Sequence, residues 1–85
     1  KLIVEPKGQL SLQSHEGRSE HWLVAEGEAE VMINDEAFNL TENQHIFIPQ
    51  GAKHRLANRG DQTLIVIEMW FGELLDENDI KRYED

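Results

Sequence analysis

The sequence predicts an all-β fold, a small antiparallel barrel or sandwich with one short helix near the C-terminal end. Many short runs alternate apolar and polar residues, which is the period of a half-buried strand. Turn residues separate these runs at regular spacing, as they do in sandwiches and barrels. The chain has 85 residues, enough for one small domain whose core is marginal on its own.

The expected strands follow one another closely along the chain. In order, they cover residues 2–5, 9–15, 20–26, 28–33, 36–40, 45–48, 54–58 and 63–70. Asn34 and Asp35 separate two alternating runs, which indicates a hairpin although the preferred glycine is missing. Asp76 is a suitable N-cap for a short helix that ends near Tyr83.

Some of these strands are apolar on more than one face. The run that contains Ile65 and Ile67 is the longest apolar one and is interrupted only by Glu68. Leu10 and Leu12 add to the apolar excess. Because a domain of this size gains stability from a partner subunit, we expect a homodimer.

Composition and charge exclude several kinds of partner. The formal net charge is −9, and nucleic-acid binding requires clustered Lys and Arg, so we expect no nucleic-acid partner. The chain has no cysteine, which excludes disulfides and thiolate metal sites. No apolar run approaches the ~20 residues that span a bilayer, so we expect a cytoplasmic domain without membrane contact. Since the first residue is Lys1, we expect residues 1–85 to be a single domain trimmed at one or both ends.

Four side chains offer nitrogen or oxygen ligands to a metal ion. Gln13 and His15 lie two residues apart and share one face of an expected strand. Glu20 starts the next strand, and His54 follows a Pro-x-Gly turn. Each of these residues alone is more often an ordinary polar side chain. Together they form a sulfur-free set that suits Zn, Mn, Fe, Co or Ni.

The spacing of these residues resembles the two motifs of the cupin superfamily. The first motif contains Gly, His-x-His, three or four residues, Glu, six residues and Gly. The second contains Pro-x-Gly, two residues, His, three residues and Asn. The matching residues here are Gly8, Gln13, His15, Glu20, Gly27, Pro49, Gly51, His54 and Asn58, with Gln13 in place of the first His. This resemblance implies a double-stranded β-helix of the jelly-roll type, with Gln13, His15, Glu20 and His54 as the metal ligands.

A narrower resemblance covers nearly the whole chain. It is carried by the stretches LSLQSHEGRSEHWLVAEGEAEV, IPQGAKHRLANRG and IEMWFGELLDENDIKRYED. These resemble the type II phosphomannose isomerase domain of bifunctional guanylyltransferase/isomerase enzymes. The resemblance implies interconversion of mannose 6-phosphate and fructose 6-phosphate through an enediolate, with a divalent metal as Lewis acid. Zn is the foremost candidate, with Mn, Co, Ni or Fe as alternatives, and the implied partner is a phosphorylated sugar or another small carbohydrate.

Three further residues are candidates for this chemistry. Glu68 is the candidate general base, because a carboxylate is unexpected in an otherwise apolar strand and a catalytic role would explain it. The alternative is a structural role, in which Glu68 forms an ion pair with a neighbouring strand. Arg18 is the first candidate for binding phosphate, and Lys53 is the second. His21 is a weaker candidate base, since it points to the opposite face of its strand, and we expect it to pack with Trp22.

Two other functions remain open. Glu16 and Gly17 stand where the isomerase family carries two histidines, which favours a non-catalytic metal-binding or sugar-binding cupin. A different cupin enzyme, such as an iron-dependent dioxygenase, is the third hypothesis.

Overall fold

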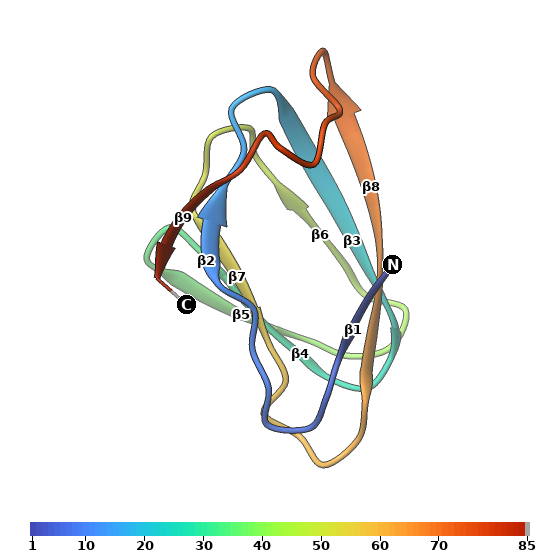
Figure 1. Ribbon diagram of the computed structural model, residues 1–85. Helices are drawn as coiled ribbons and strands as arrows, with labels where there is room; N and C mark the ends of the chain where they lie inside the picture. The colour runs from blue at the N-terminus through green and yellow to red at the C-terminus, as the bar shows by residue number, and fades with distance from the viewer. Residues whose placement is uncertain (85) are drawn as a thin grey trace.

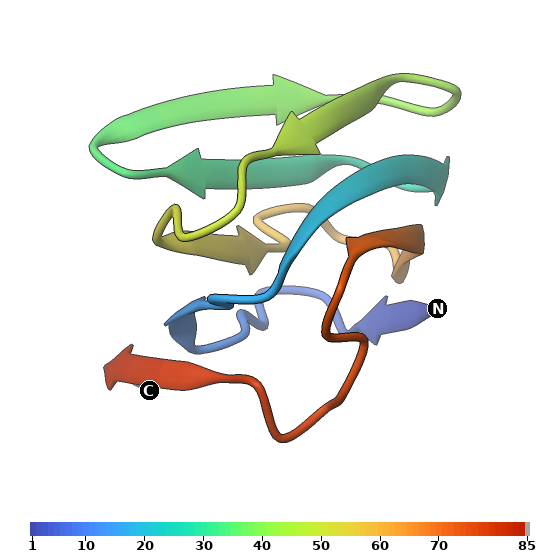
Figure 2. The ribbon, with the colours of Figure 1, turned by 90° about the horizontal axis from the view of Figure 1, so that it is seen from above.

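The chain folds into two antiparallel β-sheets that face each other (Figures 1 and 2). The computed structural model describes residues 1–84, which contain nine strands. These are β1 (Leu2–Val4), β2 (Leu12–Ser14), β3 (Arg18–Glu26), β4 (Ala29–Ile33), β5 (Glu36–Leu40), β6 (His45–Ile48), β7 (His54–Ala57), β8 (Leu64–Gly72) and β9 (Lys81–Glu84). The prediction of an all-β fold is confirmed, and no helix that could cross a membrane occurs among the described residues.

Each sheet combines strands from both halves of the sequence. One sheet has the order β1-β8-β3-β6, and the other has the order β5-β4-β7-β2-β9. β3 and β4 follow each other in the chain but belong to different sheets, so the chain crosses from one sheet to the other between them. This interleaving is typical of a jelly roll.

The inward face of β3 divides the interior into an apolar end and a polar end. Arg18, Glu20, Trp22 and Val24 alternate along the strand, and all four are buried. A period of two residues places them on one face of the sheet. Trp22 and Val24 belong to the apolar core, whereas Arg18 and Glu20 do not. The polar end of the interior is therefore the candidate location of a functional site.

The apolar end is a core built from both sheets. Its buried members are Val4, Trp22, Val24, Ala29, Val31, Ile48, Leu56, Leu64 and Val66. Full burial of one such aliphatic or aromatic side chain contributes roughly 1.5–3 kcal/mol. The core thus fixes the two sheets against each other and positions the side chains at the polar end.

The hairpin predicted at Asn34 and Asp35 is confirmed, since Ile33 pairs with Glu36 across it. Asn34 has a φ of 53°, in the left-handed region that asparagine adopts more readily than most residues. The turn therefore forms without glycine.

The strand predicted over residues 9–15 forms only in part. β2 is limited to Leu12–Ser14, and Gln9 makes a separate bridge to Ala57.

The C-terminal helix predicted from Asp76 to Tyr83 is wrong. Oδ1 of Asp76 accepts the N–H of Asn78 at 2.8 Å, which makes a local turn. The chain then continues as β9 and pairs with β2, where the hydroxyls of Ser14 and Tyr83 lie 2.8 Å apart. Without β9, β2 would be an edge strand with unpaired backbone groups. Satisfying those groups outweighs the local helix signal.

Candidate metal centre

Three of the predicted metal ligands meet at the polar end of the interior. His15 directly follows β2, Glu20 lies on β3, and His54 begins β7. One ligand atom from each lies within 4.8 Å of the others. The three side chains are only 4%, 2% and 3% exposed, respectively. A buried carboxylate requires cations or hydrogen-bond donors around it, so this cluster is arranged to hold positive charge.

Backbone carbonyls orient both imidazoles of the cluster. Nδ1 of His15 donates to the carbonyl of Asp79 at 2.6 Å, and Nδ1 of His54 donates to the carbonyl of Ala52 at 3.1 Å. Because a carbonyl oxygen only accepts, each Nδ1 carries the hydrogen. In the neutral rings Nε2 then presents a lone pair, which is the arrangement of metal-binding histidines.

The distance between His15 and Glu20 fits a metal ion. Nε2 of His15 lies 3.1 Å from Oε2 of Glu20. Two lone-pair atoms at this distance repel each other unless a cation lies against both. In a tetrahedral site with metal–ligand distances of about 2.0 Å, neighbouring ligand atoms lie about 3.3 Å apart. Two imidazoles and a carboxylate therefore suit a divalent first-row metal.

His54 is held in its neutral, ligand-competent form. Burial lowers the pKa of His54 below its ordinary value of 6.5. The Ala52 carbonyl and the Glu20 carboxylate oppose this shift in the pKa, while the neighbouring His15 and the guanidinium of Arg18 add to it. A proton therefore competes weakly with a metal at Nε2 of His54 near neutral pH.

Gln13, the fourth predicted ligand, lines the same cavity. Its backbone pairs with His54 across β2 and β7. Its amide nitrogen lies 3.4 Å from both the carbonyl and the hydroxyl oxygen of Ser11. These contacts use the amide nitrogen, and an amide binds a metal through its oxygen, so the Gln13 oxygen remains available for that role.

Arg18, the first candidate for binding phosphate, lies inside the cluster. Nε donates to Oε2 of Glu20 at 2.9 Å, and Nη2 lies 3.2 Å from Nε2 of His15. Nη1 donates to the carbonyl of Asp76 at 3.1 Å, and the guanidinium carbon lies 3.5 Å from the ring centroid of Trp70. Arg18 is thus the cation that neutralises buried Glu20 in this structure.

The two other candidates for chemistry are placed differently. Glu68 lies on the inward face of β8 and lines the cavity together with the three clustered ligands. Its Oε1 lies 3.9 Å from the amino group of Lys1. Lys53 is exposed, with Nζ 4.3 Å from the ring centroid of Tyr83, and does not line the cavity. The structure therefore brings Glu68, but not Lys53, to the metal cluster.

Two residues that support the cluster were not predicted. Nε1 of Trp22 donates to Oε1 of Glu20 at 2.8 Å, and its strand phase with Glu20 is a signal that could have indicated this contact. The carboxylate of Asp79 accepts hydrogen bonds from the backbone N–H groups of Glu16 and Gly17 at 3.1 and 2.8 Å. Its backbone carbonyl accepts the hydrogen bond from His15. No sequence pattern connects Asp79 to residues more than 60 positions earlier.

Two residues whose side chains lie outside the cluster also have defined places. His21 points away from the cluster, as expected, but packs between Phe47 and Phe71 rather than against Trp22. Asn58 is fully buried and holds the turn after β7 through hydrogen bonds to Gln62 and Gly60.

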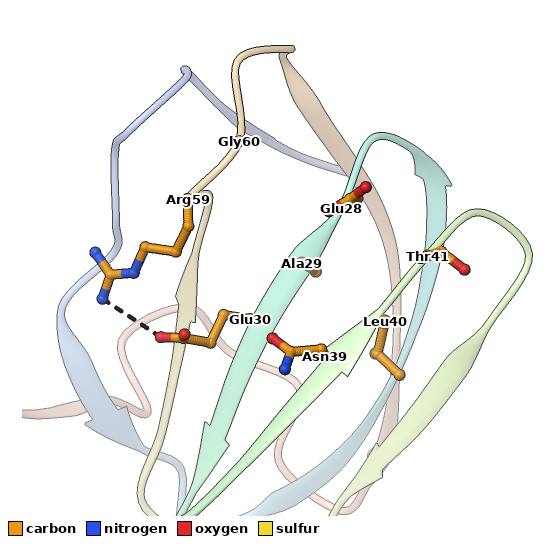
Figure 3. A pocket seen from close by; sticks show the side chains of 8 residues that line it. All are labelled: Glu28, Ala29, Glu30, Asn39, Leu40, Thr41, Arg59 and Gly60. Carbon is orange, nitrogen blue, oxygen red and sulfur yellow. Dashed lines mark hydrogen bonds and ion pairs between the residues drawn. The ribbon is translucent and has the colours of Figure 1, made fainter.

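The cavity at the cluster is small, and several larger hollows lie elsewhere on the described part of the chain. The cluster cavity measures about 50 Å³, enough for an ion and one or two waters at about 30 Å³ each. A hollow of about 170 Å³ lies beside β4 and β5, where Arg59 reaches to within 3.4 Å of Glu30 (Figure 3). It contains none of the metal-ligand candidates, so the chemistry is assigned to the smaller cavity.

Comparisons with known proteins agree with this arrangement. The sequence profile of the family described as "Mannose-6-phosphate isomerase C-terminal" matches residues 1–85. The chain is 49% identical over 84 residues to alginate biosynthesis protein AlgA of Pseudomonas aeruginosa, covering 99% of this chain and 18% of that protein. It is 45% identical over 85 residues to mannose-1-phosphate guanylyltransferase of Klebsiella pneumoniae, covering 100% of this chain and 18% of that protein. The chain thus spans less than a fifth of these relatives.

The fold is shared with a solved cupin. The cupin domain of Cnp3 from Schizosaccharomyces pombe superposes with a TM-score of 0.80 at 13% identity, covering 84% of this chain and 49% of that one. The expected jelly-roll architecture is thereby confirmed. With the profile match over its whole length, this cupin-fold chain belongs to the mannose-6-phosphate isomerase C-terminal family.

Proposed function

We propose that this domain is a metal-dependent isomerase that interconverts mannose 6-phosphate and fructose 6-phosphate. Membership of the family supports the substrate class. The observation that carries the proposal is the position of Glu68 on the wall of the cavity that holds His15, Glu20 and His54. Aldose–ketose isomerisation needs a base next to a group that polarises the substrate oxygens.

The residues divide the chemistry between binding and proton transfer. Gln13, His15, Glu20 and His54 hold a divalent metal, with Zn foremost and Mn, Co, Ni or Fe as alternatives. The metal supplies Lewis-acid polarisation of the oxygens at C1 and C2. Glu68 removes the proton from C2 of the aldose and returns it to C1, while the hydroxyl proton moves from O2 to O1.

The phosphate requires a basic group outside the closed cluster. Arg18 is buried against Glu20, so in this proposal it does not bind the phosphate. Lys53 and Arg55 flank His54 in the sequence, and Arg55 also lines the cavity. These two residues are the proposed phosphate contacts.

A coupled assay of fructose 6-phosphate formation with the metal-loaded domain tests the proposal. We expect activity in the wild type and a loss of at least 100-fold in kcat for Glu68→Gln, as expected when a general base is removed. The metal content of this variant stays unchanged, because Glu68 is not a ligand. Equal kcat values for the wild type and Glu68→Gln would contradict the assignment.

A non-catalytic metal-binding domain is the second candidate. The cavity of about 50 Å³ favours it, because a hexose phosphate is too large to enter without movement of the walls. This alternative predicts stoichiometric metal with no turnover of either sugar phosphate. The assay above distinguishes the two functions.

A further inference from the structure

The outer face of the sheet β1-β8-β3-β6 is apolar where a solvated face should be polar. Its outward positions alternate with the buried ones and are Ile3, Ser19, His21, Leu23, His45, Phe47, Ile65, Ile67, Met69 and Phe71. We call these ten residues the outer face. An antiparallel sheet with one face in water normally alternates apolar and polar residues. Here β8 carries apolar side chains on both faces.

The side chains of the outer face are exposed in the single chain. Ile3 is 61% exposed, Phe47 is 49% exposed and Phe71 is 53% exposed. In Figure 1 the outer side of β8 faces right, and no described segment of the chain lies against it. Contiguous apolar surface of this kind marks an interaction site in soluble proteins.

The ten positions of the outer face hold no Asp, Glu, Lys or Arg, and one exposed carboxylate, that of Glu26, pairs with Ile65 at the end of β3. Charged residues make up 29% of the chain, so ten positions of average composition would hold about three. The net charge of −9 opposes association of two copies through any acidic surface. Because Glu26 lies only at the end of β3, most of the outer face is uncharged, which lowers this repulsion there. An uncharged face also has no groups that would attract a charged partner.

Neighbouring strands already hold the centre of the outer face in place. His21 on β3 packs with Phe47 on β6 at a centroid distance of 5.0 Å and with Phe71 on β8 at 5.6 Å. Side chains that are ordered before association lose little conformational entropy on binding. Such pre-packed aromatic centres are common in binding hot spots.

The size of the outer face suits a dimer. At about 3.3 Å per residue and about 4.8 Å between strands, the nine residues of β3 and of β8, the four of β6 and the three of β1 cover roughly 400 Å² in projection. The accessible area of side chains exceeds this projection, so the outer face suits a small interface, below the ~800 Å² per subunit of a standard one. We propose that the outer face binds the outer face of a second copy, so that two four-stranded sheets stack in an isologous dimer.

Sedimentation velocity of the purified chain over a range of concentrations tests this proposal. We expect the wild type to sediment at twice its mass of 9.8 kDa and Met69→Glu to sediment as a monomer. Because Met69 is 48% exposed, the variant should keep its circular dichroism spectrum and its metal content. Phe38→Glu is the matched control, since Phe38 is 37% exposed on β5 of the other sheet, and it should remain dimeric.

Three outcomes would overturn the proposal. A monomeric wild type at several hundred micromolar would mean that the outer face takes a different occupant. A dimeric Met69→Glu together with a dimeric Phe71→Glu would place the interface elsewhere. Loss of the dimer in Phe38→Glu alone would assign it to the five-stranded sheet.

Discussion

Nε2 of His15 and Oε2 of Glu20 lie 3.1 Å apart, and the guanidinium of Arg18 contacts both atoms. A metal ion bound to these two atoms would occupy the position of the two Arg18 N–H groups. Arg18 and the metal therefore compete for the same ligand atoms, and cations in both places would repel each other.

Replacing Arg18 by Gln should strengthen metal binding by about tenfold or more, which corresponds to about 1.4 kcal/mol. The same variant should be less stable without metal, by about 3 kcal/mol, because Glu20 would lose its buried cation. Chelator competition measures the affinity, and urea unfolding of the metal-free protein measures the stability.

Arg59→Gln is the matched control for Arg18→Gln. Arg59 pairs with Glu30 at 3.4 Å, but the pair is exposed to solvent. An exposed ion pair contributes about 0–1 kcal/mol, so this variant should change neither quantity appreciably. Weaker metal binding in Arg18→Gln than in the wild type would refute the competition.

Restoring a histidine at Gly17 should destabilise the protein. The resemblance to the isomerase family places histidines at positions 16 and 17, but a Cβ on Gly17 would collide with Cβ of Leu74. The N–H of Gly17 also donates to Asp79 at 2.8 Å, which fixes the backbone there. We expect a lower Tm for Gly17→His and an almost unchanged Tm for Glu16→His, because Glu16 is exposed. Equal Tm values would show that the loop can adjust freely.

Asp79 should make the metal-free protein sensitive to acid. The N–H groups of Gly17 and Glu16 hold the pKa of Asp79 below its ordinary value of 3.8. A carboxylate with a lowered pKa stabilises the folded state above pH 3.8, and this contribution disappears as the pH falls through the folded-state pKa.

Asp79→Asn should remove this part of the pH dependence, as measured by urea unfolding at pH 5 and at pH 3. Asp61→Asn is the control, since Asp61 forms an exposed pair with Lys7 at 3.2 Å. If the free energy of unfolding falls by the same amount between pH 5 and pH 3 in Asp79→Asn and in the wild type, the contacts of Asp79 are not the cause of the acid sensitivity.

His54 should influence stability in a higher pH range. Burial lowers its pKa below 6.5 in the folded state, so the unfolded chain binds this proton more readily. The stability of the metal-free protein should therefore be constant above pH 6.5 on this account and decline as the pH falls below it. Nuclear magnetic resonance titration of the His54 ring measures the pKa directly, and a value above 6.5 would contradict the burial argument.

Sequence patterns predicted the parts of the site that depend on local spacing. The alternation of Glu20, Trp22 and Val24 placed these side chains on one inward face, as the structure shows. Because β3 begins at Arg18, the same alternation also places Arg18 inside. The strand expected from the sequence begins only at Glu20, so Arg18 falls outside its alternation and is expected to bind phosphate instead.

The contacts made by the C-terminal segment could not be predicted in the same way. Asp76 and Asp79 reach Arg18 and His15 because β9 returns to pair with β2. The N-cap signal at Asp76 instead predicted a local helix in this segment. Pairing between segments that are distant in sequence decides this part of the fold, and local propensity does not reveal it.

Metal analysis of the purified domain tests the central claim most directly. Inductively coupled plasma mass spectrometry should find about one divalent metal ion per chain in the wild type, as in other sites with His and carboxylate ligands. Glu20→Gln and His54→Ala should lose the metal, whereas Glu30→Gln, which alters a partly exposed carboxylate outside the cluster, should retain it. A folded wild type that takes up no Zn, Mn, Co, Ni or Fe when these ions are added would contradict the account.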